Sequence, residues 1–448
     1  MDAGINPAAG GLAPPSRAVI CEVEITDLAH DGRGIARADG KVVFVPDALP
    51  GELARIRRRR SKRQYDEAEL LAILRPAAER VAPRCAHFGL CGGCALQHCS
   101  GEAQLGFKQR HLADTFRRIA QIEPEQWLPP IAGPVWGYRR RARLGVKYVA
   151  RKQRVLIGFR ERDGRHLADL QACEVLHPAV GTKLPALAAL IGGLSLREQI
   201  PQIEVAVADN AAALVLRVFA MPAADERARL LAFGAEHGFQ FHLQPGGVDS
   251  IRPLAADAPE LYYDLPRQQL RIFFAPADFV QINAEINARL VDAALALLEP
   301  GPDEQVLELF SGLGNFSLPL AQRAARVTAV EGEAGLVARA RRNAGHNQLA
   351  GKAEFHAADL SRPSEAPWSR GSYDKLLLDP PRAGALEILP QAIASRPRRI
   401  VYISCHPATL ARDAGLLRGA GYRLTRAGVV DMFPHTHHVE AIAVFEHG

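Results

Sequence analysis

The sequence predicts an α/β protein in three parts: an N-terminal β-barrel, a central region of mixed helices and strands, and a C-terminal doubly wound parallel sheet. Three observations support this prediction. The 448 residues exceed what one hydrophobic core usually holds. Short alternating segments separated by glycine and proline occupy residues 18–75. From residue 300 onward, apolar strands alternate with helix-length segments, which is typical of a doubly wound sheet.

The first part follows a leader, residues 1–17, that lacks the pattern of a signal peptide and is expected to be flexible. Residues 18–76 contain five short strand-like segments with Gly-rich turns, as in oligonucleotide-binding barrels. The fourth segment ends in RIRRRRSKR (55–63), with seven basic residues in nine. Like charges this dense repel one another unless a phosphate backbone meets them, so we expect this run to bind nucleic acid.

Charge is distributed unevenly along the chain. Residues 1–160 carry 27 Lys and Arg against 16 Asp and Glu, and the remainder carries 28 against 33. This asymmetry favours a polyanionic partner, although the whole chain is rich in arginine. The longest apolar run, residues 184–196, is too short to cross a bilayer. We therefore expect a cytoplasmic protein that binds nucleic acid and no membrane.

The central region, residues 77–278, begins with a cluster of cysteines, CAHFGLCGGCALQHC (85–99). In a cytosolic chain this spacing favours a metal site over disulfides. Two ligand sets remain open. Cys85, Cys91 and Cys94 with the nearby Cys99 would suit tetrahedral zinc. The same three cysteines with the distant Cys173 would suit an iron–sulfur cluster.

Two further elements are predicted before the C-terminal sheet. Residues 101–120 have the apolar spacing of a helix, and YRRRARLGVKY (138–148) alternates like a strand. The arginines of the second segment are expected to contact phosphates together with the barrel.

The first strand and turn of the C-terminal sheet, VLELFSGLGNFSLPLA (306–321), point to a ligand site. Gly312 and Gly314 let the backbone approach a ligand at the carboxyl end of the strand, and Glu331 at the next strand tip suits ribose hydroxyls. A dinucleotide needs a third glycine where Ser317 stands. Glu308 beside the turn favours a cationic ligand, so S-adenosylmethionine is preferred over NAD.

Three polar residues end or begin other strands of this sheet. Asp379 ends LLLD (376–379), Cys405 ends IVYISC (400–405), and Glu440 begins the last strand. The alternatives are a helix-capping aspartate, a core cysteine, and a metal site made of Glu440 with His435, His437 and His438. A common sheet edge instead favours a nucleophile and a base. A thiolate that adds to C6 of uracil makes C5 nucleophilic, and a carboxylate then removes the C5 proton. We expect an electropositive site that ionises the thiol.

From about residue 18 onward, the chain resembles the bacterial 23S ribosomal RNA uracil-C5 methyltransferases, close relatives of the transfer-RNA uracil-C5 enzymes. The resemblance is carried by the cysteine spacing, by FVQIN (279–283), by SC-x-P-x-T around Cys405 and by PHT-x-H-x-E ending at Glu440. It implies a TRAM barrel, a central α+β iron–sulfur domain and a Rossmann-like class I methyltransferase domain at 279–448. It also implies that residues 103–135 pack with the catalytic domain.

The resemblance also assigns residues. It implies a nucleophile, a base and an acceptor-facing acid at Cys405, Glu440 and Asp379. It implies [4Fe–4S] ligands at Cys85, Cys91, Cys94 and Cys173, with Cys99 as a bystander. The donor site is expected to comprise Gln281, Phe310, Gly312, Gly314, Asn315, Glu331, Asp359 and Asp379. One departure is His406, because the family usually has asparagine after the nucleophile.

The expected function is S-adenosylmethionine-dependent formation of 5-methyluridine in 23S ribosomal RNA by a monomeric enzyme. The barrel and the cysteine cluster favour ribosomal RNA, because the transfer-RNA enzymes typically lack both. The alternatives are another RNA, another class of methyl acceptor such as protein, and a nucleic-acid-binding protein without catalysis.

Overall fold

The computed structural model describes residues 19–447, so the expected leader at 1–17 lies outside the described residues. The chain divides into two compact units, with the boundary after Val81. Within the described range, no helix is both long and apolar enough to span a membrane. The expected domain boundaries at 76 and 278 remain predictions.

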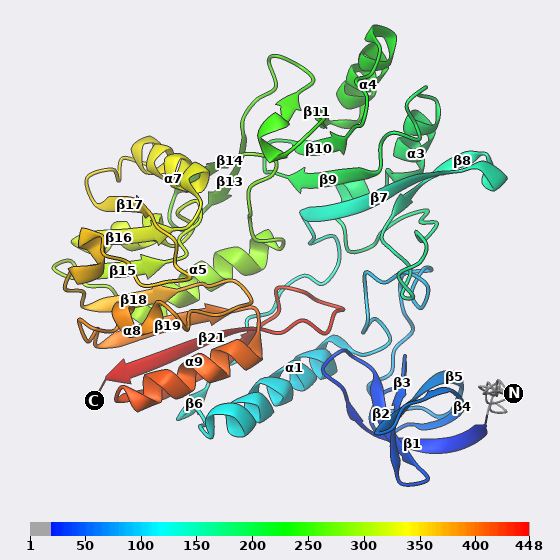
Figure 1. The fold of residues 1–448 in the computed structure, drawn as a ribbon, viewed down its shortest axis with the longest axis horizontal. Coiled ribbons are helices and arrows are strands. Elements are labelled where there is room, and N and C mark those ends of the chain that lie inside the picture. Colours follow the sequence, from blue (N-terminus) through cyan, green and yellow to red (C-terminus); the bar gives the residue numbers. More distant parts are fainter. Residues whose placement is uncertain (1–18, 448) are drawn as a thin grey trace, which may run out of the picture. The chain divides into compact units, whose positions relative to one another are not determined.

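The first unit contains a closed five-stranded barrel in the order β1-β2-β3-β5-β4, as the sequence predicts (Figure 1). Alternate side chains such as Val23, Ile25, Val43 and Ile56 fill its interior, because successive residues of a strand point to opposite faces. The strands are β1 (Ile20–Leu28), β2 (Gly34–Ala38), β3 (Lys41–Val45), β4 (Leu53–Ser61) and β5 (Tyr65–Arg75).

The second unit is built around an eight-stranded sheet with the order β17-β16-β15-β18-β19-β21-β20-β6. β15 to β19 are parallel, and β21 runs antiparallel to both β19 and β20. The strands are β15 (Gln305–Leu309), β16 (Arg326–Glu331), β17 (Ala353–Ala357), β18 (Lys375–Leu378), β19 (Arg399–Ser404), β20 (Tyr422–Val430), β21 (Glu440–His447) and the short β6 (Gln126–Trp127).

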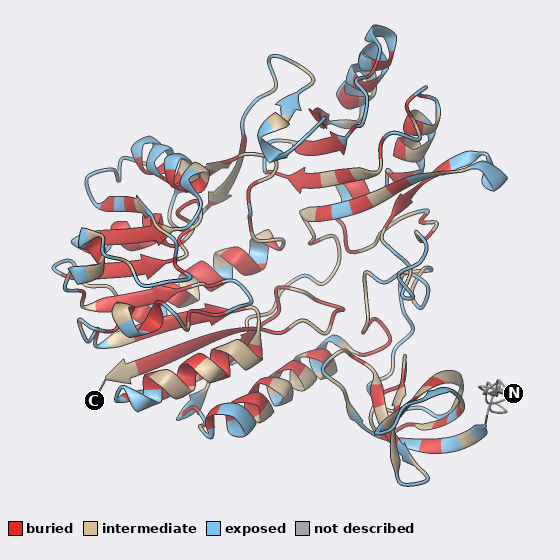
Figure 2. Cartoon of the chain, viewed as in Figure 1, coloured by how far each residue is buried: buried red, intermediate tan, exposed pale blue. Residues whose placement is uncertain are grey.

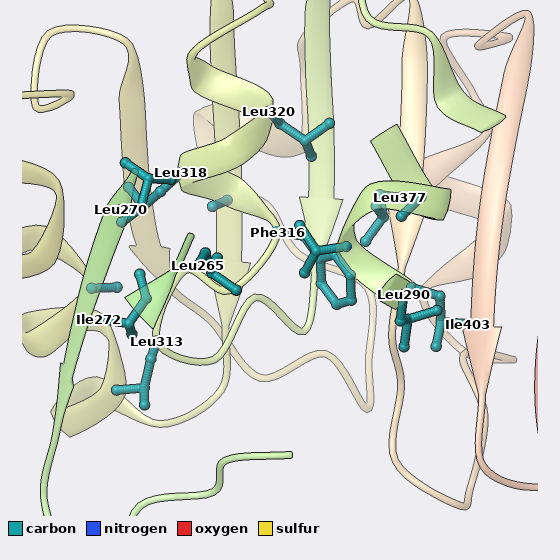
Figure 3. Close-up of a cluster of buried hydrophobic side chains, with 14 of the residues drawn as sticks. Leu265, Leu270, Ile272, Leu290, Leu313, Phe316, Leu318, Leu320, Leu377 and Ile403 are labelled. Carbon is teal, nitrogen blue, oxygen red and sulfur yellow. The ribbon is translucent and has the colours of Figure 1, made fainter. Parts of the chain in front are cut away.

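Each face of this sheet has its own apolar core, which makes the sheet doubly wound. Val306, Leu377 and Ile403 lie in one core with α5, α6 and α7 (Figure 3). Their strand neighbours Leu307 and Tyr402 lie in the other core. The strands are therefore buried on both sides (Figure 2). The helices are α5 (Ala284–Leu298), α6 (Ser317–Ala321), α7 (Ala334–His346), α8 (Leu389–Ala392) and α9 (Pro407–Gly419).

An early segment of the chain completes the second face. Helix α1 (Gly101–Thr115) places Leu112 in that core, and its π-helical continuation η1 (Phe116–Ala120) adds Phe116. Strand β6 then pairs with β20. Residues 101–127 thus pack with the C-terminal sheet, and β6 pairs with strand residues 300 positions later in the sequence.

The central residues form a six-stranded sheet, β12-β11-β10-β9-β7-β8, and a β13-β14 hairpin. Strand β7 falls within the segment predicted to be a strand. The elements are β7 (Arg141–Val149), β8 (Arg154–Gly158), β9 (Gln202–Val207), β10 (Ala212–Arg217), β11 (Phe239–Gln244), β12 (Arg252–Pro253), β13 (Leu261–Leu265), β14 (Leu270–Phe274), α2 (Pro178–Gly181), α3 (Leu184–Gly192), α4 (Ala224–His237), and the 3₁₀ turns η2 (Ala150–Lys152) and η3 (Val248–Ser250). A further 3₁₀ turn, η4 (Pro367–Arg370), lies between β17 and β18 of the C-terminal sheet.

Candidate active site

The carboxyl ends of the parallel strands bring the predicted acids and thiol to one edge of the sheet. Glu308 is the penultimate residue of β15, and Glu331 is the last residue of β16. Asp379 follows β18 directly, and Cys405 follows β19. These four strands are neighbours in the sheet, so their carboxyl ends meet at the edge where open α/β sheets bind ligands.

The antiparallel strand β21 adds Glu440 to this edge. Ser404 pairs with Ala441 in the β19–β21 register. One step further along that register places Cys405 opposite Glu440. The two side chains are close enough for the Glu440 carboxylate to oppose ionisation of the thiol. The sheet therefore brings together residues that the sequence separates by 35 positions.

The turn after β15 has the left-handed backbone that its glycines predict. Gly312 and Gly314 have φ of 54° and 93°, and a Cβ at Gly314 would lie 3.2 Å from Leu318 Cγ. Phe310 also has a positive φ, 66°, and its N–H donates to the Val330 carbonyl at 2.8 Å. Gly312 N–H donates to a carboxylate oxygen of Glu331 at 3.0 Å, which ties the turn to the neighbouring strand tip.

Asn315 is held by two residues that the sequence did not reveal. Its side-chain amide pairs reciprocally with that of Asn287 on α5, with both hydrogen bonds at 2.9 Å. The Tyr263 hydroxyl of β13 donates to the same Asn315 oxygen at 3.0 Å. Neither Asn287 nor Tyr263 belongs to a recognisable motif, because their role depends on packing between α5, the hairpin and the turn.

The other two donor-site candidates lie after β17 and before α5. Asp359 follows β17; its carboxylate accepts hydrogen bonds from both N–H and Oγ of Ser361, which lower its pKa. Gln281 is half-buried, and the next residue, Ile282, accepts a backbone hydrogen bond from Arg140 at 2.8 Å. Asn283 then caps α5 by accepting from Ile286 N–H.

Three carboxyl groups at this edge, those of Glu308, Asp379 and Glu440, are desolvated. Glu308 is fully buried, and neither of its carboxylate oxygens has a hydrogen-bond partner. Burial, with repulsion from Asp379 and Glu331, raises its pKa to about 8. Burial likewise raises the pKa of Asp379 to about 7, and burial with repulsion from Asp379 raises that of Glu440 to about 8. A site with these properties suits a ligand that brings positive charge.

The expectation of an electropositive site around the thiol is wrong. Burial, followed by the charges of Glu440 and Asp379, raises the pKa of Cys405 to about 11, and Arg382 only partly opposes this effect. The expectation followed from the need of the thiol to ionise, whereas burial and the carboxylates at the same sheet edge oppose that ionisation.

His406 takes over a structural task at the position where the family usually has asparagine. It is the N-cap of α9, and its Nδ1 accepts from Thr409 N–H at 3.4 Å. Asparagine is a favoured N-cap because its side-chain oxygen accepts the same kind of hydrogen bond. The departure therefore preserves the start of α9 directly after the thiol.

The four cysteines expected to bind a cluster line one small pocket. Cys85, Cys91, Cys94 and Cys173 face it together with Phe88, Phe159 and Leu170. Burial, together with its thiol neighbours, raises the pKa of Cys94 to about 12. Cys99 does not line the pocket and is buried elsewhere.

A metal centre is nevertheless not shown. Between residues 19 and 447, no group of three or more His, Cys, Asp or Glu side chains has the arrangement that would hold a metal ion. This finding covers both the cysteines and the alternative set of Glu440 with the three nearby histidines.

The two basic runs are largely neutralised by the protein itself. In the barrel, Arg55, Arg57, Arg58 and Arg59 form ion pairs with barrel carboxylates. In the second run, Arg140 and Arg143 pair with Asp209 and Glu204, and Arg141 donates to the Pro276 carbonyl. The expectation that residues 138–148 contact phosphates stays a prediction.

Comparisons with known proteins agree with this geometry. The family model described as tRNA (Uracil-5-)-methyltransferase matches residues 103–447, and that of the TRAM domain matches residues 20–71. A 23S rRNA (uracil(1939)-C(5))-methyltransferase RlmD of Methylococcus capsulatus is 51% identical over 97% of this chain and 99% of its own length. The enzyme of the same name from Xanthomonas axonopodis pv. citri is 50% identical over 95% of this chain and 97% of its own length.

One solved structure has the same fold over nearly the whole chain. It is the Pyrococcus abyssi tRNA (uracil-54, C5)-methyltransferase in complex with S-adenosyl-L-homocysteine, with 23% identity and a TM-score of 0.74 over 95% of this chain and all of that one. With a TRAM match over residues 20–71 and the family match over residues 103–447, the chain belongs to the RNA uracil-C5 methyltransferase family described as tRNA (Uracil-5-)-methyltransferase.

Proposed function

We propose that the chain transfers a methyl group from S-adenosylmethionine to C5 of a uracil in cytoplasmic 23S ribosomal RNA, forming 5-methyluridine. The observation that carries this proposal is the register that sets Cys405 opposite Glu440, beside Asp379, at the ligand-binding edge of the sheet. Relatives about half identical over nearly their full length favour the uracil that their names number 1939.

The residues at this edge fit the methyl donor. The left-handed turn at Gly312 leaves open space beside its Cα, and Glu331 at the next strand tip suits ribose hydroxyls. The buried, unpartnered carboxylate of Glu308 is suited to positive charge. S-adenosylmethionine, when bound, would supply the methyl group and a sulfonium cation.

Cys405, after losing its proton, adds its sulfur to C6 of the uracil. The electron pair of the C5–C6 double bond moves toward C5. The new C5–methyl bond forms as the bond between the methyl group and the sulfonium sulfur breaks, which would leave S-adenosylhomocysteine. Glu440 removes the C5 proton, the C5–C6 double bond re-forms, and the bond between C6 and Cys405 breaks. Arg382 favours the thiolate. The target base must leave its stack to reach this edge.

Trapping with 5-fluorouracil-containing RNA tests this proposal, because fluorine at C5 cannot be removed as a proton. A 23S ribosomal RNA fragment and a transfer RNA are compared as substrates. Wild type and Glu440→Gln should form a covalent complex with the ribosomal fragment, and Cys405→Ala should form none. A complex that survives Cys405→Ala, or trapping confined to the transfer RNA, would contradict the proposal.

We further propose that Cys85, Cys91, Cys94 and Cys173 hold a [4Fe–4S] cluster. Four cysteine thiols line one pocket, and a [4Fe–4S] cluster takes four thiolate ligands. Because a cluster is larger than a single metal ion, its ligands lie farther apart than those of one zinc ion, which fits thiols that do not form a single-ion site. The cluster would supply structural order rather than electrons, since methyl transfer needs none. Anaerobically purified protein should contain about four iron and four sulfide per chain. Cys173→Ser should lose this iron and Cys99→Ser should keep it, whereas zinc in place of iron would refute the assignment.

A further inference from the structure

The loop that precedes Glu440 is fastened by a segment of the chain more than 290 residues earlier. Residues 431–439 connect β20 to β21 and contain His435, which is buried and has a φ of 64°. A left-handed histidine is unfavourable and persists only where its surroundings hold it. In Figure 1 this loop, in red, lies by the N-terminal end of α1, and the hydrogen bonds given below join the two.

Every backbone polar group of His435 is bound by that earlier segment. Its carbonyl accepts from Ala95 N–H and Leu96 N–H, both at 2.9 Å. Its N–H donates to the Gln104 side-chain oxygen at 2.9 Å. Its ring stacks on Trp136 with the centroids 4.0 Å apart.

Gln104 joins this loop to the cysteine-bearing segment. Its side chain is 3% exposed, and its amide nitrogen donates to the carbonyls of Leu96 and Cys99 at 3.1 and 2.9 Å. The same nitrogen lies 3.3 Å from Nδ1 of His435. The Gln104 amide thus bridges residues 96–99 and residue 435, alongside the direct hydrogen bonds from Ala95 and Leu96 to the His435 carbonyl.

Two further residues, Lys108 and Tyr138, hold the same loop. The buried Lys108, one helical turn after Gln104 on α1, pairs with Asp431 at 2.6 Å and donates to the Phe433 carbonyl. The Tyr138 hydroxyl donates to the Pro434 carbonyl at 3.0 Å. The loop is therefore held up to His435, five residues before Glu440.

We propose that Gln104 is a positioning residue: through His435 it sets the path of the loop into β21 and hence the placement of Glu440 against C5 of the uracil. The inference rests on the proposed role of Glu440 as the base. Proton removal depends on placement within a fraction of an ångström. Addition of Cys405 to C6 depends on β19 and α9, whereas the side-chain hydrogen bonds of Gln104 go to Leu96, Cys99 and His435.

The test compares Gln104→Leu with Gln104→Glu, which keeps an acceptor for His435 N–H. Gln109→Leu is the matched control, because it makes the same change on α1 at a side chain whose oxygen accepts no hydrogen bond. Each variant is given the unsubstituted 23S ribosomal RNA fragment and S-adenosylmethionine, and turnover and covalent intermediate are measured. Circular dichroism and donor binding verify folding.

In Gln104→Leu, kcat should fall on the order of 10²-fold with both KM values within about twofold, and the methylated covalent intermediate should accumulate. Gln104→Glu should recover most of kcat, and Gln109→Leu should behave as wild type. Wild-type turnover in Gln104→Leu, or a loss of kcat without accumulated intermediate, would overturn the inference about Gln104. If wild type still forms the covalent complex with fluorouracil-containing RNA, the proposed function would stand. Absence of that trapping in wild type would instead reject the proposed function.

Discussion

At the scale of single residues, the site is defined by acids that are difficult to ionise. Glu308, Asp379 and Glu440 all have raised pKa values because burial removes their solvation, and the charge of Asp379 adds to this effect at Glu308 and Glu440. The Cys405 thiol is affected in the same direction. The unliganded site therefore retains protons at neutral pH, and a cationic donor would favour their release.

This arrangement makes the stability of the unliganded protein depend on pH. A carboxyl whose pKa rises on folding contributes stability that is full below its unfolded pKa and is lost as pH rises through the folded value. For Glu308 this loss of stability takes place between pH 4.5 and about pH 8. We expect the thermal midpoint to fall between pH 5 and pH 9, and Glu308→Gln to make that fall smaller. Glu354→Gln, at an ion-paired surface residue of β17, is the control. The same dependence of the thermal midpoint on pH in wild type and both variants would contradict the raised pKa of Glu308.

The base also sets the pH dependence of turnover. Glu440 must be deprotonated to accept the C5 proton, and its pKa in the unliganded protein is about 8. We expect kcat with saturating substrates to rise with pH through a limb at or below this value, because a bound cation lowers the pKa of a carboxyl. Single-turnover rates between pH 6 and pH 9 measure this limb. A rate that is flat over that range would argue against Glu440 as the base.

At the scale of elements, the strands could be predicted and their distant partners could not. Apolar runs such as residues 399–404 identify parallel strands because both faces are buried. No local pattern indicates that β6, two residues long, would extend the sheet, or that Gln104 would meet His435 across 331 positions. The Asn287–Asn315 pair is hidden for the same reason, since it depends on the packing of α5 against the turn.

The amide pair gives a test at this scale. Asn287→Leu leaves one side of Asn315 without its reciprocal partner, which should misalign the turn that binds the donor. Loss of a buried hydrogen-bond pair corresponds to roughly a tenfold change in affinity. We expect titration calorimetry to show that Asn287→Leu weakens S-adenosylmethionine binding by about tenfold. Tyr263→Phe should reduce the affinity by less. Unchanged affinity in Asn287→Leu would show that Asn315 needs no support from α5.

At the scale of the whole molecule, net charge indicated the partner class but not the contact residues. The basic run of β4 reads as a uniform phosphate-binding patch in sequence, yet four of its arginines are paired with barrel carboxylates. Carboxylates from β1, β5 and the β2–β3 turn reach these arginines only when the barrel closes. In the part of the chain that the structure describes, Arg60, Lys62 and Arg63 are exposed and have no ion-pair partner.

These three cations should carry the electrostatic share of RNA binding by the barrel. Replacing Arg60, Lys62 and Arg63 by alanine should weaken binding of the 23S ribosomal RNA fragment and reduce the slope of log K against log salt by about 2 to 3. Replacing Arg323, Arg370 and Arg396 outside the barrel makes the same change in charge and should have less effect. Fluorescence anisotropy over a salt series measures both. Equal slopes for the two triple variants would mean that the barrel does not provide these contacts.

The most direct measurement of the central claim is the intact mass of Glu440→Gln after incubation with S-adenosylmethionine and the unsubstituted 23S ribosomal RNA fragment. Without a base, the C5 proton stays in place and the C6–sulfur bond cannot break. The expected result is protein covalently joined to methylated RNA, with the attachment at Cys405 after digestion. Unmodified protein, together with methylation by a Cys405→Ser variant at the wild-type rate, would contradict covalent catalysis at this thiol.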